Sequence, residues 1–375
     1  VAVIRVFPIN FNIGTDEEKI SITKNFERFL NSLDFPVQIF IKTEDLDISN
    51  HYKAIDLKLK KKYRSYFEDY KTNLNKITDE NKARNRKFYL IIKEASNLEI
   101  QVNICLERLK ALNLRAYRLN KNALLKLLND FFKPDEKNAA VDVDRLNYYN
   151  YLISPGSIKN KIDYLEIDNK FHRIINAYNY PRAVESGFLD RIITLNGEFD
   201  ISIFIEPFNI ETTIVKINKE LQKQRADLYS LEKRKILNTS LKLKYKDTKK
   251  TLEELQRGNQ KLFNLSFYID ARADSKKDMD FLTKKIEAEL NSLLIVPRIA
   301  LFSMHKALKS VMPLSINELN ITRNITSEAL SAFFPFTSQF LDIDKDGVLL
   351  VLNKNNIPII KDIYGLGNSN GLILS

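Results

Sequence analysis

Few residues in this sequence have the types and spacing that catalysis requires. The histidines, His51, His172 and His305, lie far apart, and no metal-ligand spacing surrounds any of them. The sequence contains no GxxxxGK(S/T) or GxGxxG pattern, which are signatures of phosphate binding. It also lacks the HExxH pattern of zinc-dependent proteases and the GxSxG pattern of acyl-transfer enzymes. We therefore predict that the chain has no catalytic, cofactor-binding or metal-binding residues and is not an enzyme by itself.

Two further features could do chemistry, and both favour a structural interpretation. The stretch DIDKDG at 342–347 places acids at alternate positions, as a calcium loop does, but the twelfth position counted from Asp342 is Asn353 instead of glutamate. We interpret it as a turn between strands. The single cysteine, Cys105, excludes an internal disulfide, and its place in the helical pattern EIQVNICLERLKAL predicts a buried, small hydrophobic side chain.

The net charge of +11 is concentrated in two segments. Residues 53–87 contain 12 Lys and Arg against 5 Asp and Glu, and residues 216–250 contain 12 against 4. A basic helix face attracts phosphate backbones or anionic lipid headgroups, although a solvated lysine-rich face is also common in soluble proteins. Base stacking needs exposed aromatic side chains between basic ones, and most aromatic residues here, such as Phe26 and Phe334, have core-like positions.

Hydrophobic periodicity predicts an α+β (mixed α/β) fold with two lobes of strand–helix–strand units whose helices pack on sheets. The first lobe covers 1–134 and includes a long polar helix at about 49–81. A polar stretch punctuated by Pro and Gly at 135–163 is the predicted linker. The second lobe covers 164–375 and repeats the order of elements of the first, which by itself does not establish that the two halves are homologous.

A basic helical arm is predicted at 211–257 within the second lobe. Its leucines keep two helical faces with a break at Asn238–Thr239, so periodicity leaves one long helix and a helical hairpin as alternatives. Helix starts are indicated by a capping box, in which Thr15 is followed three residues later by Glu18, and by Ser275 as an N-cap.

Three stretches together resemble one protein family. They are FERFLNSLDFPVQIFI at 26–41, RIINAYNYPRAVESGFLDRIITLNGEFDISIFIEP at 173–207, and AFFPFTSQFLDIDKDGVLLVLNKNNIPIIKDIYGLGNSNGLILS at 332–375. In this order they are similar to the N-terminal region of the VirB4/TraC/TrbE ATPases of type IV secretion and conjugation machines. The family pattern has a helix before FP(V/I)QI, then a YPR…G(F/W)L signature, and then an Asn/Gly turn that leads into a phosphate-binding loop. Each motif alone is loose, and their order carries the resemblance.

The resemblance implies that a motor domain begins at about 340–375 and that the strand GLILS at 371–375 would lead into its phosphate-binding loop. The sequence contains no such loop, so we expect no cofactor in this chain and expect ATP and Mg²⁺ in the full-length protein, which would be the ATPase. The chain is then interpreted as a piece cut from the N-terminal region of that ATPase.

The resemblance further implies a non-catalytic role, in docking to the inner-membrane channel and in subunit assembly during conjugative DNA transfer. The implied partners are inner-membrane components of a type IV secretion channel, further copies of the chain, as in a hexamer, and an anionic membrane surface. The implied location is cytoplasmic, peripheral at the inner face of the cell membrane. The basic helices at 53–87 and 211–257 are the predicted contact regions. Two alternatives stay open, a nucleic-acid-binding module of a DNA-translocating complex and a stand-alone scaffold derived from the ATPase.

Overall fold

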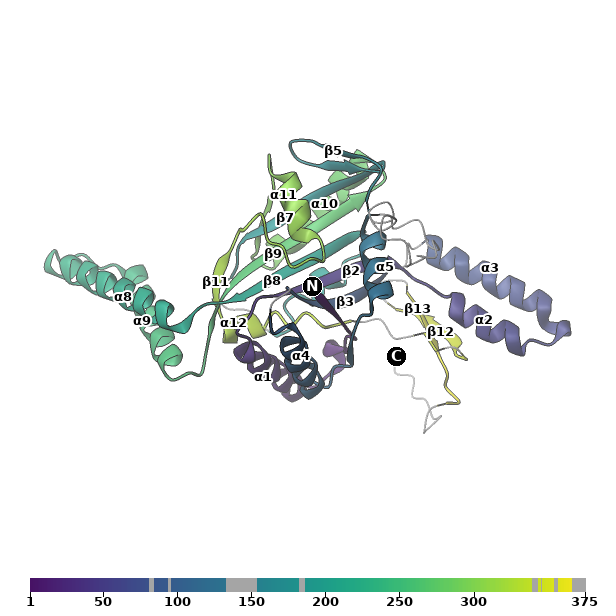
Figure 1. Cartoon of the computed structure of the whole chain (residues 1–375), viewed down its shortest axis with the longest axis horizontal. Helices are drawn as coiled ribbons and strands as arrows, with labels where there is room; N and C mark the ends of the chain where they lie inside the picture. Colours follow the sequence, from purple (N-terminus) through teal and green to yellow (C-terminus); the bar gives the residue numbers. More distant parts are fainter. Residues whose placement is uncertain are drawn as a thin grey trace.

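One large antiparallel sheet with helices on both faces forms the centre of the molecule (Figure 1). The computed structural model describes residues 1–80, 84–93, 96–132, 154–181, 186–338, 343–344, 346–353 and 357–365. Within these ranges the strands follow one another across the sheet as β4 (Ala116–Arg118), β1 (Ala2–Val6), β3 (Arg84–Ile92), β2 (Val37–Asp45), β8 (Phe199–Pro207), β9 (Leu262–Ala273), β7 (Lys170–Asn179), β6 (Leu165–Ile167) and β5 (Ile158–Asn160). In addition, β10 (Val296–Ile299) pairs with β7, and β11 (Arg323–Thr326) pairs with β9. The predicted α+β class is confirmed.

The two halves of the chain arrange their elements in the same way. The first half contains β1, the 3-10 turn η1 (Phe11–Ile13), α1 (Asp16–Ser32), β2, β3, α4 (Leu98–Ala111) and β4, in the sheet order β4-β1-β3-β2. The second half contains β7, α7 (Asp190–Ile193), β8, β9, α10 (Lys276–Ser292) and β10, in the sheet order β10-β7-β9-β8. Both orders are the split strand–helix–strand arrangement of ferredoxin-like folds. The repeated order of elements in the sequence is therefore also a repeat in space.

The two halves join edge to edge through β2 and β8. These strands are antiparallel, and Ile39 lies opposite Ile203 at the centre of the pairing. This register relates the halves by an approximate two-fold axis through that pair. Strands from both predicted lobes, 1–134 and 164–375, thus join in one large sheet, while the lobe boundaries stay a prediction. The end of the predicted linker 135–163 contains β5, and most of the linker lies outside the described residues.

Helices cover both faces of the sheet, because successive side chains of a strand point to opposite faces and both sets are apolar. One face, which includes Ile39, packs against α1, α4, α7, α10 and α12 (Ser327–Ser331). The other face, which includes Phe40, packs against α5 (Lys121–Phe132) and α11 (Met304–Val311). Each of the helices α5 and α11 follows the last strand of its own half, so the repeat extends to the second face.

A helical hairpin connects the second and third strands of each half. Helices α2 (Ser49–Lys58) and α3 (Arg64–Glu80) connect β2 to β3, and helices α8 (Ile210–Lys233) and α9 (Thr239–Gln256) connect β8 to β9. Because β2 and β8 are antiparallel, the hairpins leave the sheet at opposite ends, and Figure 1 shows them at the two ends of the long axis.

The prediction of one long helix at about 49–81 is wrong. The chain leaves the α-helix at Leu59, whose backbone is extended (φ −76°, ψ 125°), and the 3-10 turn η2 (Lys61–Tyr63) leads into α3. Apolar residues continue at helical spacing across this break, so periodicity conceals it. For 211–257 the hairpin is the correct alternative. The break lies at Asn238, whose side chain caps α9 by accepting a backbone N–H of the first turn at 3.0 Å.

Local signals in the sequence are confirmed where near neighbours decide the structure. The Thr15 hydroxyl accepts the Glu18 N–H at 3.3 Å, and the Glu18 carboxylate accepts the Thr15 N–H at 2.8 Å. The Ser275 hydroxyl accepts the Asp278 N–H at 3.1 Å. Cys105 is buried in the core, as predicted, and burial raises the pKa of its thiol to about 12.

A separate two-stranded ribbon lies beside the α2/α3 hairpin (Figure 1). It consists of β12 (Val348–Leu352) and β13 (Pro358–Lys361). The Asp344 side chain accepts the Asp362 N–H at 3.0 Å and so braces the ribbon on one side. Part of DIDKDG and all of GLILS lie outside the described residues, so the turn at 342–347 and the motor domain start stay predictions.

Candidate docking surfaces and a charged cleft

Aromatic and polar contacts hold the helices of the α2/α3 hairpin together. His51 Nε2 lies 2.9 Å from the Tyr70 hydroxyl, and the Tyr52 hydroxyl donates to Asn75 at 2.8 Å. The Tyr52 ring also packs edge-on against the ring of Phe67. Burial raises the pKa of the Tyr70 hydroxyl, which therefore keeps its proton at neutral pH. These contacts fix α2 and α3 side by side.

The same hairpin packs on the β12–β13 ribbon. Ile48, Leu74 and Ile360 form a small buried apolar cluster between the two. Lys58 Nζ also pairs with Asp346 at 2.7 Å, although both side chains are largely exposed and such a pair adds little stability. The apolar cluster therefore ties the position of the hairpin to that of the ribbon.

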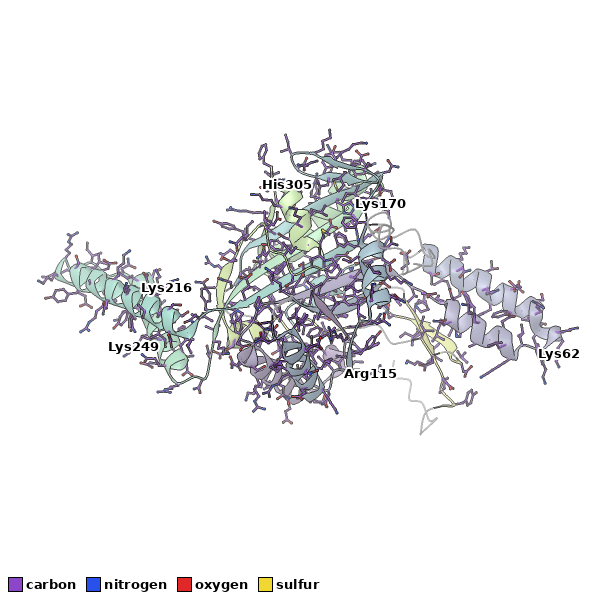
Figure 2. All side chains as sticks on the ribbon, in the orientation of Figure 1. Lys62, Arg115, Lys170, Lys216, Lys249 and His305 are labelled. Atoms are coloured by element: carbon purple, nitrogen blue, oxygen red, sulfur yellow. The ribbon has the colours of Figure 1, made fainter. Side chains whose placement is uncertain are left out.

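The turn of the α2/α3 hairpin is basic and exposes apolar side chains. We call residues 57–66, LKLKKKYRSY, the first tip; it holds five Lys and Arg and no acid. Leu57 is 88% exposed and Tyr66 is 72% exposed. Lys62 lies at this end of the molecule in Figure 2, with its ammonium 4.7 Å from the centre of the Tyr63 ring.

The α8/α9 hairpin depends mainly on contacts between its own two helices. Glu220 on α8 accepts from Lys244 on α9 at 3.2 Å and from Gln224 at 3.0 Å. The hydrogen bonds from Gln224 and Lys244 lower the pKa of Glu220. The buried residues of the hairpin are Thr213, Gln224, Leu252 and Leu255. Three of these four lie near the base, so most of the hairpin is surrounded by solvent.

The turn of the α8/α9 hairpin has the same chemistry as the first tip. We call residues 229–244, YSLEKRKILNTSLKLK, the second tip; it holds five Lys and Arg and one acid, Glu232. Leu237 is 97% exposed, and Tyr229 is also exposed. Figure 2 labels Lys216 and Lys249 on the same hairpin, nearer its base.

Positive charge next to exposed apolar side chains favours an anionic surface with an apolar layer beneath it. Each Lys or Arg close to an anionic membrane contributes about 1 kcal/mol, and aliphatic and aromatic side chains gain by entering the headgroup boundary. An acidic protein surface with an apolar centre would fit the same residues. The sequence predicted the basic segments but not their exposed apolar residues, because helical spacing does not distinguish an apolar residue in a turn from one in the core.

Ion pairs are buried between the sheet and the layer of α5 and α11. Arg272 on β9 is 2% exposed and donates to Asp200 on β8 at 2.8 Å, and its Nε lies 3.7 Å from Glu198. Burial opposes the charge on Arg272, but Asp200 and Glu198 outweigh burial and raise its pKa. On the same face, His172 Nδ1 lies 3.0 Å from Asp270. The sequence analysis did not identify these residues. Their alternation with apolar residues, in DIS at 200–202 and IDAR at 269–272, would have indicated them.

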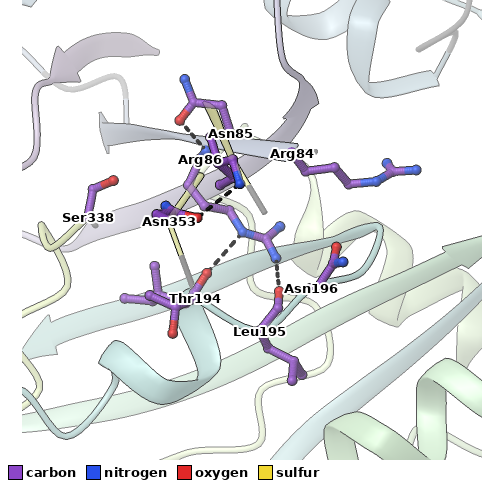
Figure 3. A pocket seen from close by; sticks show the side chains of 10 residues that line it. Arg84, Asn85, Arg86, Thr194, Leu195, Asn196, Ser338 and Asn353 are labelled. Carbon is purple, nitrogen blue, oxygen red and sulfur yellow. Dashed lines mark hydrogen bonds between the residues drawn. The ribbon is translucent and has the colours of Figure 1, made fainter. Parts of the chain in front are cut away.

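Arg86 on β3 lines a small cavity, which Figure 3 shows from close by. Its guanidinium donates to the backbone carbonyls of Ile193 at 3.1 Å, Leu195 at 2.9 Å and Phe199 at 2.8 Å. It also lies over the Phe199 ring at 4.0 Å. Burial lowers the pKa of Arg86 to about 9, so the side chain stays charged at neutral pH. The remaining volume of about 40 Å³ fits a few water molecules, and Arg86 acts as an anchor for the loop between α7 and β8.

A cleft of about 580 Å³ lies at the base of the α2/α3 hairpin. We call it the charged cleft. Its walls come from the end of β2, the hairpin, α5 and the starts of β3 and β7. Its charged side chains include Lys42, Glu44, Lys87, Lys126, Asp130 and Glu198. Volumes of this size are typical of sites that hold one small molecule.

Comparison with known protein families identifies the family of this chain. Residues 1–132 match the archaeal TraC-like domain. Residues 117–321 match the family described as CagE, TrbE, VirB family, component of type IV transporter system, and this match covers more than half of the chain. The chain belongs to the CagE/TrbE/VirB family. The resemblance found in the sequence is thereby confirmed, and the protein is a VirB4/TraC/TrbE-type component of a type IV transport system. No curated protein matches the chain.

Both tips lie inside the matched ranges of this CagE/TrbE/VirB family member. The first tip and Lys42 fall in the archaeal TraC-like range 1–132, and the second tip falls in 117–321. The histidines are on α2, β7 and α11, so the structure does not bring them together. None of the helices in the described ranges combines the length and apolar character that crossing a bilayer requires.

Proposed function

We propose that this chain is the non-catalytic docking region of a VirB4/TraC-type ATPase, and that its two tips attach the ATPase to the inner face of the cell membrane at the type IV channel. The observation that carries the proposal is the pair of basic tips with exposed apolar residues, at opposite ends of one sheet. Family membership supports a role in type IV transport, and the chemistry of the tips supports attachment to an anionic surface.

Subunit assembly belongs to the same proposal. The α8/α9 hairpin projects from the sheet and exposes apolar residues such as Val215 and Leu243 along its length. In an oligomer such as a hexamer, a neighbouring copy would pack on this apolar surface, which the chain's own core leaves exposed. The hairpin would then act as an intersubunit arm as well as a support for the second tip.

We further propose that ATP and Mg²⁺ act in another part of the full-length protein. The sequence contains no GxxxxGK(S/T) loop, and in the described ranges no group of three or more His, Cys, Asp or Glu side chains is arranged to hold a metal ion. These two observations support the proposal that a magnesium–nucleotide complex is held elsewhere in the protein. Their contribution is to position the ATPase at the membrane.

Vesicle flotation tests the docking role. The full chain should float with phosphatidylglycerol vesicles and not with phosphatidylcholine vesicles. The first-tip variant Lys61→Gln/Lys62→Gln should lower the affinity about tenfold or more, because each lysine contributes about 1 kcal/mol near an anionic surface. The matched control Arg108→Gln/Lys110→Gln removes the same charge from exposed positions on α4 and should bind as wild type does. Equal losses in both variants, or no flotation of wild type, would rule out docking through the tips.

Nucleic-acid binding is a second candidate function, favoured by exposed tyrosines beside lysines in both tips. Tyr63, Tyr66 and Tyr229 are exposed, in contrast to the core positions of most aromatic residues. Bases stack on such rings, and the adjacent lysines attract the backbone. If this candidate is correct, a single-stranded oligonucleotide binds with strong salt dependence and Tyr66→Ser weakens the binding. Absence of binding at low ionic strength would remove this candidate.

A further inference from the structure

The charged cleft contains a buried lysine that has no direct partner among the residues that the structure describes. Lys42 lies on β2, lines the cleft and is 2% exposed. Among the described residues, its ammonium takes part in no hydrogen bond and no close ion pair. Burial lowers the pKa of Lys42, because a buried ammonium loses its hydration. A buried cation of this kind is costly unless an anionic oxygen approaches it.

The nearest acids on the sheet already have other cations as partners. Asp200 accepts from Arg272 at 2.8 Å, deep in the sheet. Glu44 pairs with Lys87 at the edge of the cleft. Both acids act on Lys42 only from a longer distance. The described part of the chain therefore places a positive charge at the wall of the cleft without an acidic oxygen in direct contact with it.

The side chains that α5 and the hairpin contribute to the cleft are suited to a polar ligand. Asp130 and Lys126 on α5 line the cleft, and Tyr52 and Thr78 contribute hydroxyl groups from the hairpin. Burial raises the pKa of Asp130, and the nearby Lys42 and Lys126 act against that rise. Lys126 is exposed at the rim and adds a second positive charge. A volume of about 580 Å³ leaves room for a small molecule rather than an isolated ion.

We propose that the charged cleft is a binding site for a small anionic ligand that places a phosphate or carboxylate oxygen on Lys42 Nζ. The oxygen supplies the partner that Lys42 lacks among the described residues, and the exposed Lys126 adds attraction. Because β2, α5 and the α2/α3 hairpin all contribute walls, the bound ligand contacts the sheet and the hairpin together. The site is separate from the first tip, since none of the residues 57–66 lines the cleft.

Thermal unfolding of the full chain tests the site, with inorganic phosphate and succinate as separate probes. Each effective anion should raise Tm in a saturable manner at low ionic strength. Lys42→Met should weaken the apparent affinity at least about tenfold, the loss expected for a hydrogen bond between charged groups. Lys110→Met, at an exposed position on α4, is the matched control and should leave the affinity unchanged. Without anion, Lys42→Met should unfold at the same or a higher temperature, because a buried charge is removed.

Chemical modification of the wild-type chain gives a second measurement that needs no variant. A small amine-reactive reagent should label Lys42, and phosphate should slow this labelling while the exposed Lys110 on α4 is labelled at an unchanged rate, as measured by mass spectrometry. Vesicles of phosphatidic acid form a further arm. Protection by free phosphate or succinate assigns the site to a soluble ligand, and protection by vesicles alone assigns it to a lipid headgroup.

Two results would overturn the proposal. One is that no anion, free or in vesicles, slows the labelling of Lys42. The other is that Lys42→Met keeps the wild-type response to phosphate. A lower Tm of that variant together with an unchanged response would show instead that Lys42 only supports the buried ion pairs around Asp200.

Discussion

The two helical hairpins occupy equivalent positions in the two halves but are supported differently. The α2/α3 hairpin packs through Leu74 on the β12–β13 ribbon, whereas α8/α9 relies on contacts between its own helices, such as Lys244 with Glu220. Both end in basic tips with exposed apolar residues. Both hairpins therefore present positive charge and exposed apolar side chains at their tips. Only the α2/α3 hairpin also packs on the β12–β13 ribbon.

The bases of the hairpins also differ in their electrostatics. At the base of the α2/α3 hairpin, where Glu198 lines the charged cleft, burial disfavours the charge of Glu198. Arg272 and Arg84 outweigh the effect of burial and hold the pKa of Glu198 below its ordinary value. At the base of the α8/α9 hairpin, burial and the nearby Glu328 raise the pKa of Glu27. The charge of Glu198 therefore stabilises the base of the first hairpin, whereas the charge of Glu27 is unfavourable at the base of the second.

Truncating the apolar contact of the first hairpin should have the largest effect. Leu74 is 1% exposed, so Leu74→Ala should lower the free energy of unfolding by about 2–5 kcal/mol. The matched variant Leu241→Ala, half-buried on α9, should cost roughly 1 kcal/mol because less apolar area is lost. Urea denaturation of both variants measures the difference, and equal losses would mean that the two hairpins are supported alike.

Hydrogen exchange should show the difference in the wild-type chain. Amides in the tip-side halves of α8 and α9 should exchange about tenfold or more faster than those of α3 around Leu74, because few side chains are buried around them. Leu74→Ala should bring the α3 amides close to the α9 rate. Protection of α9 that matches or exceeds that of α3 in the wild-type chain would contradict the contrast.

Glu198, at the base of the α2/α3 hairpin, should stabilise the fold at pH values above the pKa that Glu198 has in the unfolded chain. The depressed pKa of Glu198 means that its contribution is present above pH 4.5, the ordinary value, and is lost as pH falls from there through the folded pKa. Glu198→Gln should therefore be less stable than wild type at neutral pH, and the gap should narrow on acidification below pH 4.5. Urea denaturation across this range measures the gap, and a gap that is independent of pH would refute the assignment.

The acid at the second base should have the smallest effect, with the opposite sign. The raised pKa of Glu27 means that its charge destabilises the fold above the folded pKa, and that the penalty falls with pH and is absent only below pH 4.5. Glu27→Gln should be slightly more stable than wild type at neutral pH, and the difference should disappear below pH 4.5. A loss of stability at neutral pH would show that Glu27 is held by favourable interactions.

The sequence predicted the features that depend on residues close together in the chain. The capping box at Thr15, the burial of Cys105 and most strands and helices follow from local patterns. The break at Leu59 was missed because apolar residues continue at helical spacing through it. The pairing of Ile39 with Ile203 was missed because the two strands lie far apart in the sequence, and nothing in their periodicity specifies which edges meet.

The charged cleft was missed for a related reason. Lys42 lies near the end of a strand, where a charged residue is usually solvated, and its burial depends on α5 and on the hairpin base closing over it. The two basic regions, by contrast, could be predicted from charge counts. Their division into two tips could not, because it depends on where each hairpin turns.

Fluorescent labels at both tips would test the docking account most directly. Cys105 is buried, so a dye sensitive to polarity can be placed selectively at Ser65→Cys in the first tip, at Ser240→Cys in the second tip, or at the exposed control Ser292→Cys on α10. On addition of phosphatidylglycerol vesicles, the account predicts a blue shift at both tips and none at the control, because the tips enter the headgroup boundary. Binding of the chain to the vesicles without a shift at either tip would contradict it.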